Sequence, residues 1–226
     1  MKKLAALLLV LVMVISMAAC GTKVMSHKDY IATEMDAEVI VETYVQAAQG
    51  WWEKDGQGVI TVYCQSKDGA YFAYEMKCSK EDAAKLVAGT KIKITGTKGA
   101  WAGEIEIMDG TFEFVKGDTF IAEAFDATSL IGSDALIDHQ NEKVAFKGMT
   151  VKKVEYQNGE PGKDIYVTLE KDGKTLSACV ESYLTGPDSD VYKAVGELQE
   201  GDVIDMEGFL YWYEGANPHV TGITKK

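Results

Sequence analysis

Aromatic side chains near the ends of predicted β-strands are the groups in this sequence best suited to bind a ligand. Flat rings exposed beside a sheet stack on sugars, bases or apolar side chains, and stacking on a nucleobase contributes about 1 to 3 kcal/mol per base. The alternative is that the rings close the ends of a barrel or fill a domain interface. The candidate ligand-binding residues are Trp51, Trp52, Tyr63, Trp101, Tyr166, Tyr211, Trp212 and Tyr213.

Residues that build catalytic or metal centres are sparse in the sequence. His27, His139 and His219 lie far apart, without the HxxxH or HxH spacing of zinc sites. No GxSxG elbow is present to activate a serine nucleophile. Phosphate chemistry on related barrels relies on arginine, and the chain has none. We therefore expect no enzymatic activity, no metal and no cofactor.

The charge of the chain is strongly negative. All 23 basic residues are lysine, and the formal net charge is −12. A chain of this charge repels polyanions and forfeits the counterion release that dominates nucleic-acid affinity, so we expect nucleic acid to be an unlikely partner. The one modest basic candidate is the stripe of Lys91, Lys93 and Lys98 on a single predicted strand.

The N-terminus has the features of an export signal. Lys2 and Lys3 precede an apolar run over residues 4–17, which is too short for a membrane-spanning helix and is followed by small residues and Cys20. This ending resembles the lipobox of bacterial lipoproteins, in which the cysteine is lipidated. We expect residues 1–19 to be a signal peptide and Cys20 to anchor an exported protein at the outer face of the cytoplasmic membrane. A secretory signal with an incidental cysteine is the alternative.

The remaining cysteines do not form a disulfide framework. Cys64, Cys78 and Cys179 are odd in number and lack CxxC spacing. A bridge between Cys64 and Cys78 is possible if their strands are neighbours, but we favour buried free thiols.

The chain repeats one structural plan over residues 38–115 and 143–224. VITVYCQSKDGAYFAYEM from Val59 matches DIYVTLEKDGKTLSACVE from Asp164, and each predicts two alternating strands joined by a Lys-Asp-Gly hairpin. A short helix follows in each copy, from Ser79 and from Asp188. Three glycine pairs are then separated by the same interval, namely Gly89 and Gly201, Gly96 and Gly208, and Gly103 and Gly215.

The order strand, hairpin, helix, glycine-led strand and final strand resembles the OB-fold. Its most familiar element is the segment after the helix, seen at Leu86–Gly96 and Leu198–Gly208. The chain looks like the tandem OB-fold lipoproteins of Gram-positive bacteria, a resemblance that implies a fold and supplies no catalytic residues. We expect an all-β protein with short helices, made of two tandem five-stranded Greek-key barrels. An immunoglobulin-like sandwich is the competing fold, but it does not need a helix at this position.

Five segments follow from the repeat. After the signal peptide, residues 20–35 are expected to be a lipid-attached tether, and residues 36–116 the first barrel domain. Residues 117–141 contain helix starts and apolar side chains, so we expect a helical linker that packs between the barrels. Residues 142–226 are the second barrel domain.

Strand parity predicts which side chains enter each core, because successive side chains point to opposite faces. In copy two, Ile165 and Val167 are expected inside and Tyr166 outside. In copy one, the second strand should direct Tyr63 outward. Its inward set is Ile60, Val62 and Cys64, and that of the third strand is Phe72, Tyr74 and Met76, with Tyr71, Ala73 and Glu75 outside.

These observations favour a lipid-anchored binding module that captures a neutral ligand, a glycan or a peptide, on aromatic-lined barrel faces. The alternative is a structural or adaptor lipoprotein that docks onto a protein partner in the cell envelope. Nucleic-acid binding through the OB-folds ranks third because of the charge.

Overall fold

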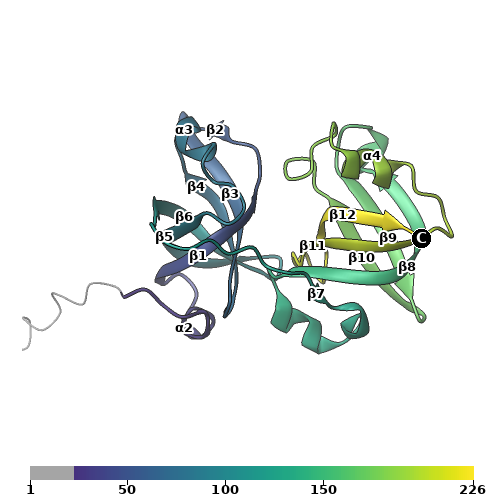
Figure 1. Ribbon diagram of the computed structural model, residues 1–226, viewed down its shortest axis with the longest axis horizontal. Coiled ribbons are helices and arrows are strands. Elements are labelled where there is room, and N and C mark those ends of the chain that lie inside the picture. The colour runs from purple at the N-terminus through teal and green to yellow at the C-terminus, as the bar shows by residue number, and fades with distance from the viewer. Residues whose placement is uncertain (1–22) are drawn as a thin grey trace, which may run out of the picture.

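Two β-barrels lie side by side in the molecule (Figure 1). The computed structural model describes residues 23–226, so the predicted signal peptide and Cys20 lie outside the described residues. No helix in the described part of the chain is long and apolar enough to cross a membrane. The protein is all-β with a few short helices.

The first barrel is closed by its first strand. β1 pairs with both β5 and β3, which joins the two ends of the order β1-β5-β6-β4-β3, while the short β2 extends the edge beside β3. β4 and β6 run parallel and the other pairs are antiparallel. The strands are β1 (Glu38–Ala48), β2 (Trp52–Lys54), β3 (Gln57–Ser66), β4 (Gly69–Lys77), β5 (Lys91–Trp101) and β6 (Glu104–Phe114).

The five strands that close the second barrel repeat this topology, whereas the short β7 pairs in parallel with β8 and has no counterpart among the strands of the first barrel. β8 pairs with both β11 and β9, and β10 runs parallel to β12 as β4 does to β6. The duplicated OB-like fold expected from the glycine interval is therefore confirmed. The strands are β7 (Phe125–Asp126), β8 (Lys143–Tyr156), β9 (Ile165–Lys171), β10 (Lys174–Val180), β11 (Val203–Phe209) and β12 (His219–Lys225), with a short 3-10 turn at Gln157–Gly159.

The two Lys-Asp-Gly hairpins form, but with different registers. In copy two Lys171 pairs with Lys174, and Asp172 and Gly173 both have positive φ, as the tightest hairpin turn requires. In copy one Ser66 pairs with Gly69 instead, which moves the turn back by one residue. The same tripeptide is therefore used in two ways.

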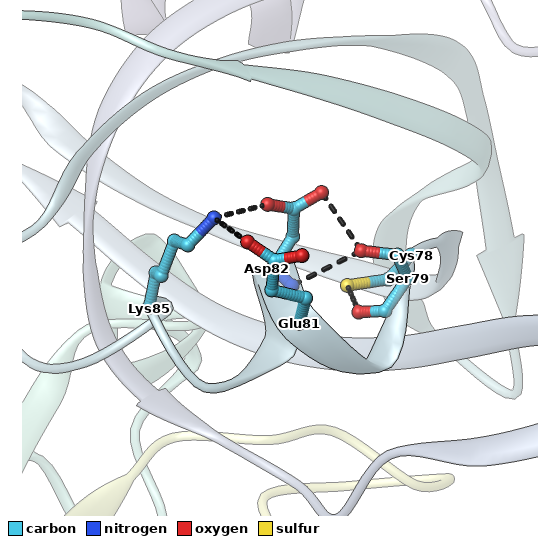
Figure 2. Close-up of polar contacts among 5 residues, drawn as sticks. All are labelled: Cys78, Ser79, Glu81, Asp82 and Lys85. Atoms are coloured by element: carbon cyan, nitrogen blue, oxygen red, sulfur yellow. Dashed lines mark hydrogen bonds and ion pairs between the residues drawn. The ribbon is translucent and has the colours of Figure 1, made fainter.

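Each helix between the third and fourth strands of a barrel begins at a serine cap. Ser79 Oγ accepts a hydrogen bond from Asp82 N at 3.0 Å at the start of α3 (Lys80–Ala83). Figure 2 shows this cap together with Lys85, which bonds both Glu81 and Asp82. Ser189 caps α4 (Asp190–Gly196) in the same manner through Tyr192 N. The start of each helix is thus determined by residues close to it in the sequence.

Strand parity is right for β3 and β9 and wrong for most of β4. Tyr71 and Ala73 lie in the barrel core with Met76, whereas Phe72 and Tyr74 point outward. The cause is a β-bulge opposite Thr61, where the register shifts and Glu75 takes a φ of 47°. One extra residue reverses the alternation, so the parity that holds at Met76 fails upstream of the bulge.

The linker packs mainly on the second barrel. Ile131 and Leu136 are buried in that core, and Ser133 caps the 3-10 helix Asp134–His139, which follows another 3-10 turn at Thr128–Leu130. Other apolar linker side chains that we expected to be buried remain exposed, namely Ile121, Phe125 and Ile137. At the other end, α2 (His27–Ala32) covers the first barrel through the buried Tyr30.

All three cysteines of the described chain are free and buried. The free-thiol alternative for Cys64 and Cys78 is therefore confirmed.

Candidate ligand site between the barrels

Three aromatic rings pack together at the contact between the barrels. Tyr63 and Phe72, on the outer face of β3 and β4, meet Phe209 of β11, and the Tyr63 and Phe209 ring centroids lie 4.7 Å apart. All three rings are buried. The outer sheet face, where OB-folds usually bind ligands, is thus partly covered by the second barrel in copy one.

Hydrogen bonds cross the interface on both sides of this ring cluster. Gln49 Nε2 donates to Glu181 Oε2 at 2.9 Å, and Gly50 N donates to the carbonyl oxygen of Tyr183 at 3.1 Å. On the far side, Trp212 N donates to Glu104 Oε2 at 2.8 Å. These bonds fix the relative position of the two barrels.

A cleft of about 530 Å³ opens beside the ring cluster. This volume is in the range of small-molecule sites. Both barrels contribute aromatic rings, and three rings at its mouth are well exposed, Tyr183 at 73%, Trp52 at 43% and Tyr74 at 41%. The lining residues are Gln49, Gly50, Trp52, Thr61, Phe72, Tyr74, Glu75, Glu181, Tyr183, Tyr211 and His219.

The bulge in β4 places side chains of the first barrel in the wall of the cleft. It turns Phe72 and Tyr74 outward, and Thr61 Oγ1 supports it by accepting a hydrogen bond from Glu75 N at 3.1 Å. Tyr211 lies two residues after the end of β11 and stacks on His219 with 4.3 Å between ring centroids. The wall from the second barrel is therefore also held by packing.

Two carboxyl groups are the charged groups that line the cleft. Glu75 pairs with Lys54 at the rim. Glu181 accepts hydrogen bonds from Gln49 Nε2 and from Tyr183 N, and burial raises its pKa to about 7. Burial also lowers the pKa of His219 to about 4, so this imidazole is neutral at physiological pH.

Three of the sequence-predicted aromatics meet at this cleft. Trp52 and Tyr211 line it, and Tyr63 lies buried beneath it, in contact with Phe72 and His219. The side chain of Tyr63 does point outward from the first barrel, as strand parity predicted, but the second barrel covers it.

The other five predicted aromatics lie elsewhere. Trp51 packs against the first core and donates from Nε1 to Cys78 O at 2.9 Å. Trp212 lies against Gly103 and borders a second groove beside the linker. Trp101, Tyr166 and Tyr213 are exposed and do not line the cleft.

Sequence reasoning missed most of the cleft. Phe72 and Tyr74 were assigned to the core because a bulge leaves no mark in the alternation of residue types. Tyr183 and Glu181 lie just after β10, in a loop that the repeat does not single out. A search for aromatic residues near the end of β10 would have found Tyr183.

The predicted lysine stripe is not available to a polyanion. Lys98 Nζ donates to the carbonyl oxygens of Tyr30, Ile31 and Thr33, at 2.7 to 3.0 Å, and the side chain is buried. Lys91 pairs with Glu42, and Lys93 pairs with Glu113. The stripe therefore stabilises the first barrel.

No residues in the described part of the chain form a metal-binding group of three or more histidine, cysteine or carboxylate side chains. The cleft accordingly offers aromatic faces, carboxyl groups and neutral donors as its binding chemistry.

No protein-family model and no curated protein matches the chain. Similar solved structures include a murine DNA-binding protein bound to double-stranded DNA, 14% identical, with a TM-score of 0.41 over 83% of this chain and 96% of that chain. The HINa domain of Ifi202 in complex with 20-bp double-stranded DNA is 12% identical, with a TM-score of 0.37 over 84% and 98%. The HINb domain of p204 is 14% identical, with a TM-score of 0.37 over 82% and 95%. These likenesses concern the fold alone.

Two sequence-based expectations are corrected. The expected partner, a neutral glycan or peptide or a docked envelope protein, is corrected; two of these three solved structures are complexes with double-stranded DNA. The cleft also carries Glu75 and Glu181, which is a poor match for a neutral ligand. The expectation that nucleic acid is an unlikely partner is corrected with it. That the chain is not an enzyme stays a prediction.

Proposed function

We propose that this chain is a binding protein that takes a small organic ligand into the cleft between its two barrels. The observation that carries the proposal is the convergence of Trp52, Phe72 and Tyr74 from one barrel with Tyr183 and Tyr211 from the other around one cavity. Pockets that are largely apolar and hold a few placed polar groups are the usual small-molecule sites, and they occur preferentially between domains.

The duplicated fold supplies the position of this site. Each OB-like barrel presents an outer face on its second and third strands, and in copy one that face supplies Thr61, Phe72 and Tyr74. The second barrel adds a wall instead of an identical second site. Ligand binding therefore requires both barrels, and it stabilises their docking by mass action.

Single-stranded nucleic acid is the second candidate. The feature that favours it is the set of exposed rings at the cleft mouth, Trp52, Tyr74 and Tyr183, because bases stack on such rings. The lysines of the stripe are engaged within the first barrel, so such binding would rest on base stacking. It would therefore depart from the steep salt dependence of phosphate-driven complexes.

We further propose that the protein is an exported lipoprotein anchored through Cys20. The support is the signal-like N-terminus and its resemblance to a lipobox. The anchor would present both barrels outside the cytoplasmic membrane.

The test of the proposed function uses ligand-detected NMR on the full chain in an uncharged detergent. A set of neutral, cationic and anionic fragments is screened, together with labelled single- and double-stranded oligonucleotides. We expect fragment signals that vanish in Tyr183→Ala and persist in Tyr166→Ala, a matched exposed tyrosine away from the cleft. Fragment binding that is unchanged in Tyr183→Ala would contradict the proposal. Oligonucleotide binding that depends on Tyr183 would establish the second candidate instead.

A further inference from the structure

The charges of the cleft are of one sign. Glu75 and Glu181 are its acidic lining residues, and the only basic type among the lining residues is His219, which is neutral. The same imbalance holds for the chain as a whole. The acidic lining therefore disfavours an anionic occupant and favours a cation.

The two carboxyl groups differ in their partners. Glu75 is paired with Lys54, so the rim of the cleft already accommodates one primary ammonium group beside Tyr74. Glu181 accepts from the amide of Gln49 and from the backbone N–H of Tyr183, both neutral donors. No lysine pairs with Glu181 within the described residues, so its negative charge is left for a ligand to balance.

The aromatic walls attract the same kind of group. The face of each indole, phenol or phenyl ring carries negative electrostatic potential, which attracts cations, and the attraction grows when the cation is desolvated. Tyr183 lies two residues after Glu181, and its backbone N–H donates to the Glu181 carboxyl group. Both side chains line the cleft, so a ring and a carboxyl group lie together at its wall.

We propose that the occupant of the cleft is an organic cation, a substituted ammonium or guanidinium group held between the aromatic walls and the Glu181 carboxylate. The inference rests on the proposed function and names its ligand class. Burial of Glu181 favours its protonated form in the free protein, and a bound cation favours the ionised form. Binding is therefore accompanied by proton release near neutral pH.

The experiment compares three probes of nearly equal shape and different charge. Choline is the cation, 3,3-dimethylbutanol its neutral counterpart and 3,3-dimethylbutanoate its anion, each titrated against the full chain in uncharged detergent and followed by NMR. We expect choline to bind at least tenfold more tightly than the alcohol, and the anion most weakly of the three. In Glu181→Gln the preference for choline over the alcohol should fall about tenfold.

Glu113→Gln is the matched control, because Glu113 is an exposed carboxylate outside the cleft. It should leave the preference unchanged. Tyr183→Ala, at a highly exposed position, gives a second test that does not endanger folding, and it should weaken choline binding.

Equal affinity for choline and the alcohol, a preference that survives Glu181→Gln, or no binding of choline overturns the inference. These results leave the proposed function standing if other fragments still bind in a manner that depends on Tyr183. If no fragment binds in a manner that depends on Tyr183, both the inference and the proposed function are wrong.

Discussion

The phenol oxygen of Tyr63, in the first barrel, lies 2.6 Å from Nδ1 of His219, in the second. Burial raises the pKa of the phenol and lowers that of the imidazole, so both groups are neutral. The bond therefore joins two neutral groups, and the tautomer of His219 sets which of them donates. Because His219 also stacks on Tyr211, this bond ties the interface to a wall of the cleft.

Tyr63→Phe should loosen the contact between the barrels. The substitution keeps the stacked ring but leaves His219 Nδ1 buried without its hydrogen-bond partner, which costs about 1 to 3 kcal/mol. We expect this loss in the free energy of unfolding, measured by denaturant titration with tryptophan fluorescence. Tyr166→Phe, at a more exposed phenol, is the control and should change stability by less than about 0.5 kcal/mol. An equal effect of both substitutions would contradict the role given to this bond.

Glu104 should make stability fall as pH rises. It is fully buried at the interface, its Oε2 accepts from Trp212 N, and burial raises its pKa to about 8, with the nearby Glu106 contributing in the same direction. Its Oε1 and the Oδ1 of Asn141 have no hydrogen-bond donor. The carboxyl proton of a protonated Glu104 is such a donor.

The sign of the pH effect follows from proton uptake. Between about pH 4.5 and pH 8 the folded protein holds a proton on Glu104 that the unfolded chain releases, so stability declines with rising pH across this window. Glu104→Gln should remove the share of that decline that Glu104 causes, with a stability gain over the parent that grows to about 4 kcal/mol at pH 8. Denaturation midpoints of both proteins across the window measure it. A constant difference between them would rule out titration of Glu104.

The sequence predicted the fold well because the repeat encodes it locally. The glycine interval, the serine cap at Ser79 and the alternation in β3 and β9 each depend on near neighbours in the chain. The second helix was expected from Asp188, and its cap is the next residue, Ser189. The site was predicted poorly because it depends on distant residues. Tyr63 and His219 are brought together by docking of the barrels, and no local pattern specifies that contact.

A single backbone feature accounts for the largest error. Glu75 adopts a left-handed conformation, which is uncommon for a residue other than glycine, and so the bulge in β4 could not be predicted from residue type. The resulting change of face moved Phe72 and Tyr74 from the expected core to the cleft.

Cys20→Ser should release the protein from the membrane. The prediction rests on the lipobox-like ending, since a lipid on Cys20 would be the means of attachment after cleavage of the signal. Fractionation of expressing cells, followed by detection of the chain in membrane and soluble fractions, measures it. Cys64→Ser is the control, because that thiol is buried in the first barrel. A Cys20→Ser protein that stays with the membrane would exclude lipid anchoring.

The repeated glycines should be needed for close strand approach. A Cβ on Gly208 would lie 2.2 Å from the carbonyl oxygen of His219, and one on Gly96 would lie 2.6 Å from Ile107 Cγ2 and 2.8 Å from Met108 O. Gly208→Ala and Gly96→Ala should therefore each destabilise their barrel by about 1 to 3 kcal/mol.

Gly222→Ala is the matched control for this pair of substitutions, because its added Cβ would meet Glu207 Cβ at an ordinary 3.9 Å. Denaturant titrations of the three variants should place Gly222→Ala within about 0.5 kcal/mol of the parent. Gly208→Ala should in addition weaken ligand binding, since the displaced carbonyl belongs to His219, a residue that lines the cleft. Gly96→Ala should not, because Gly96 lies on β5 and does not line it. Equal binding losses in both would mean that the effect reflects general destabilisation and not the shape of the cleft.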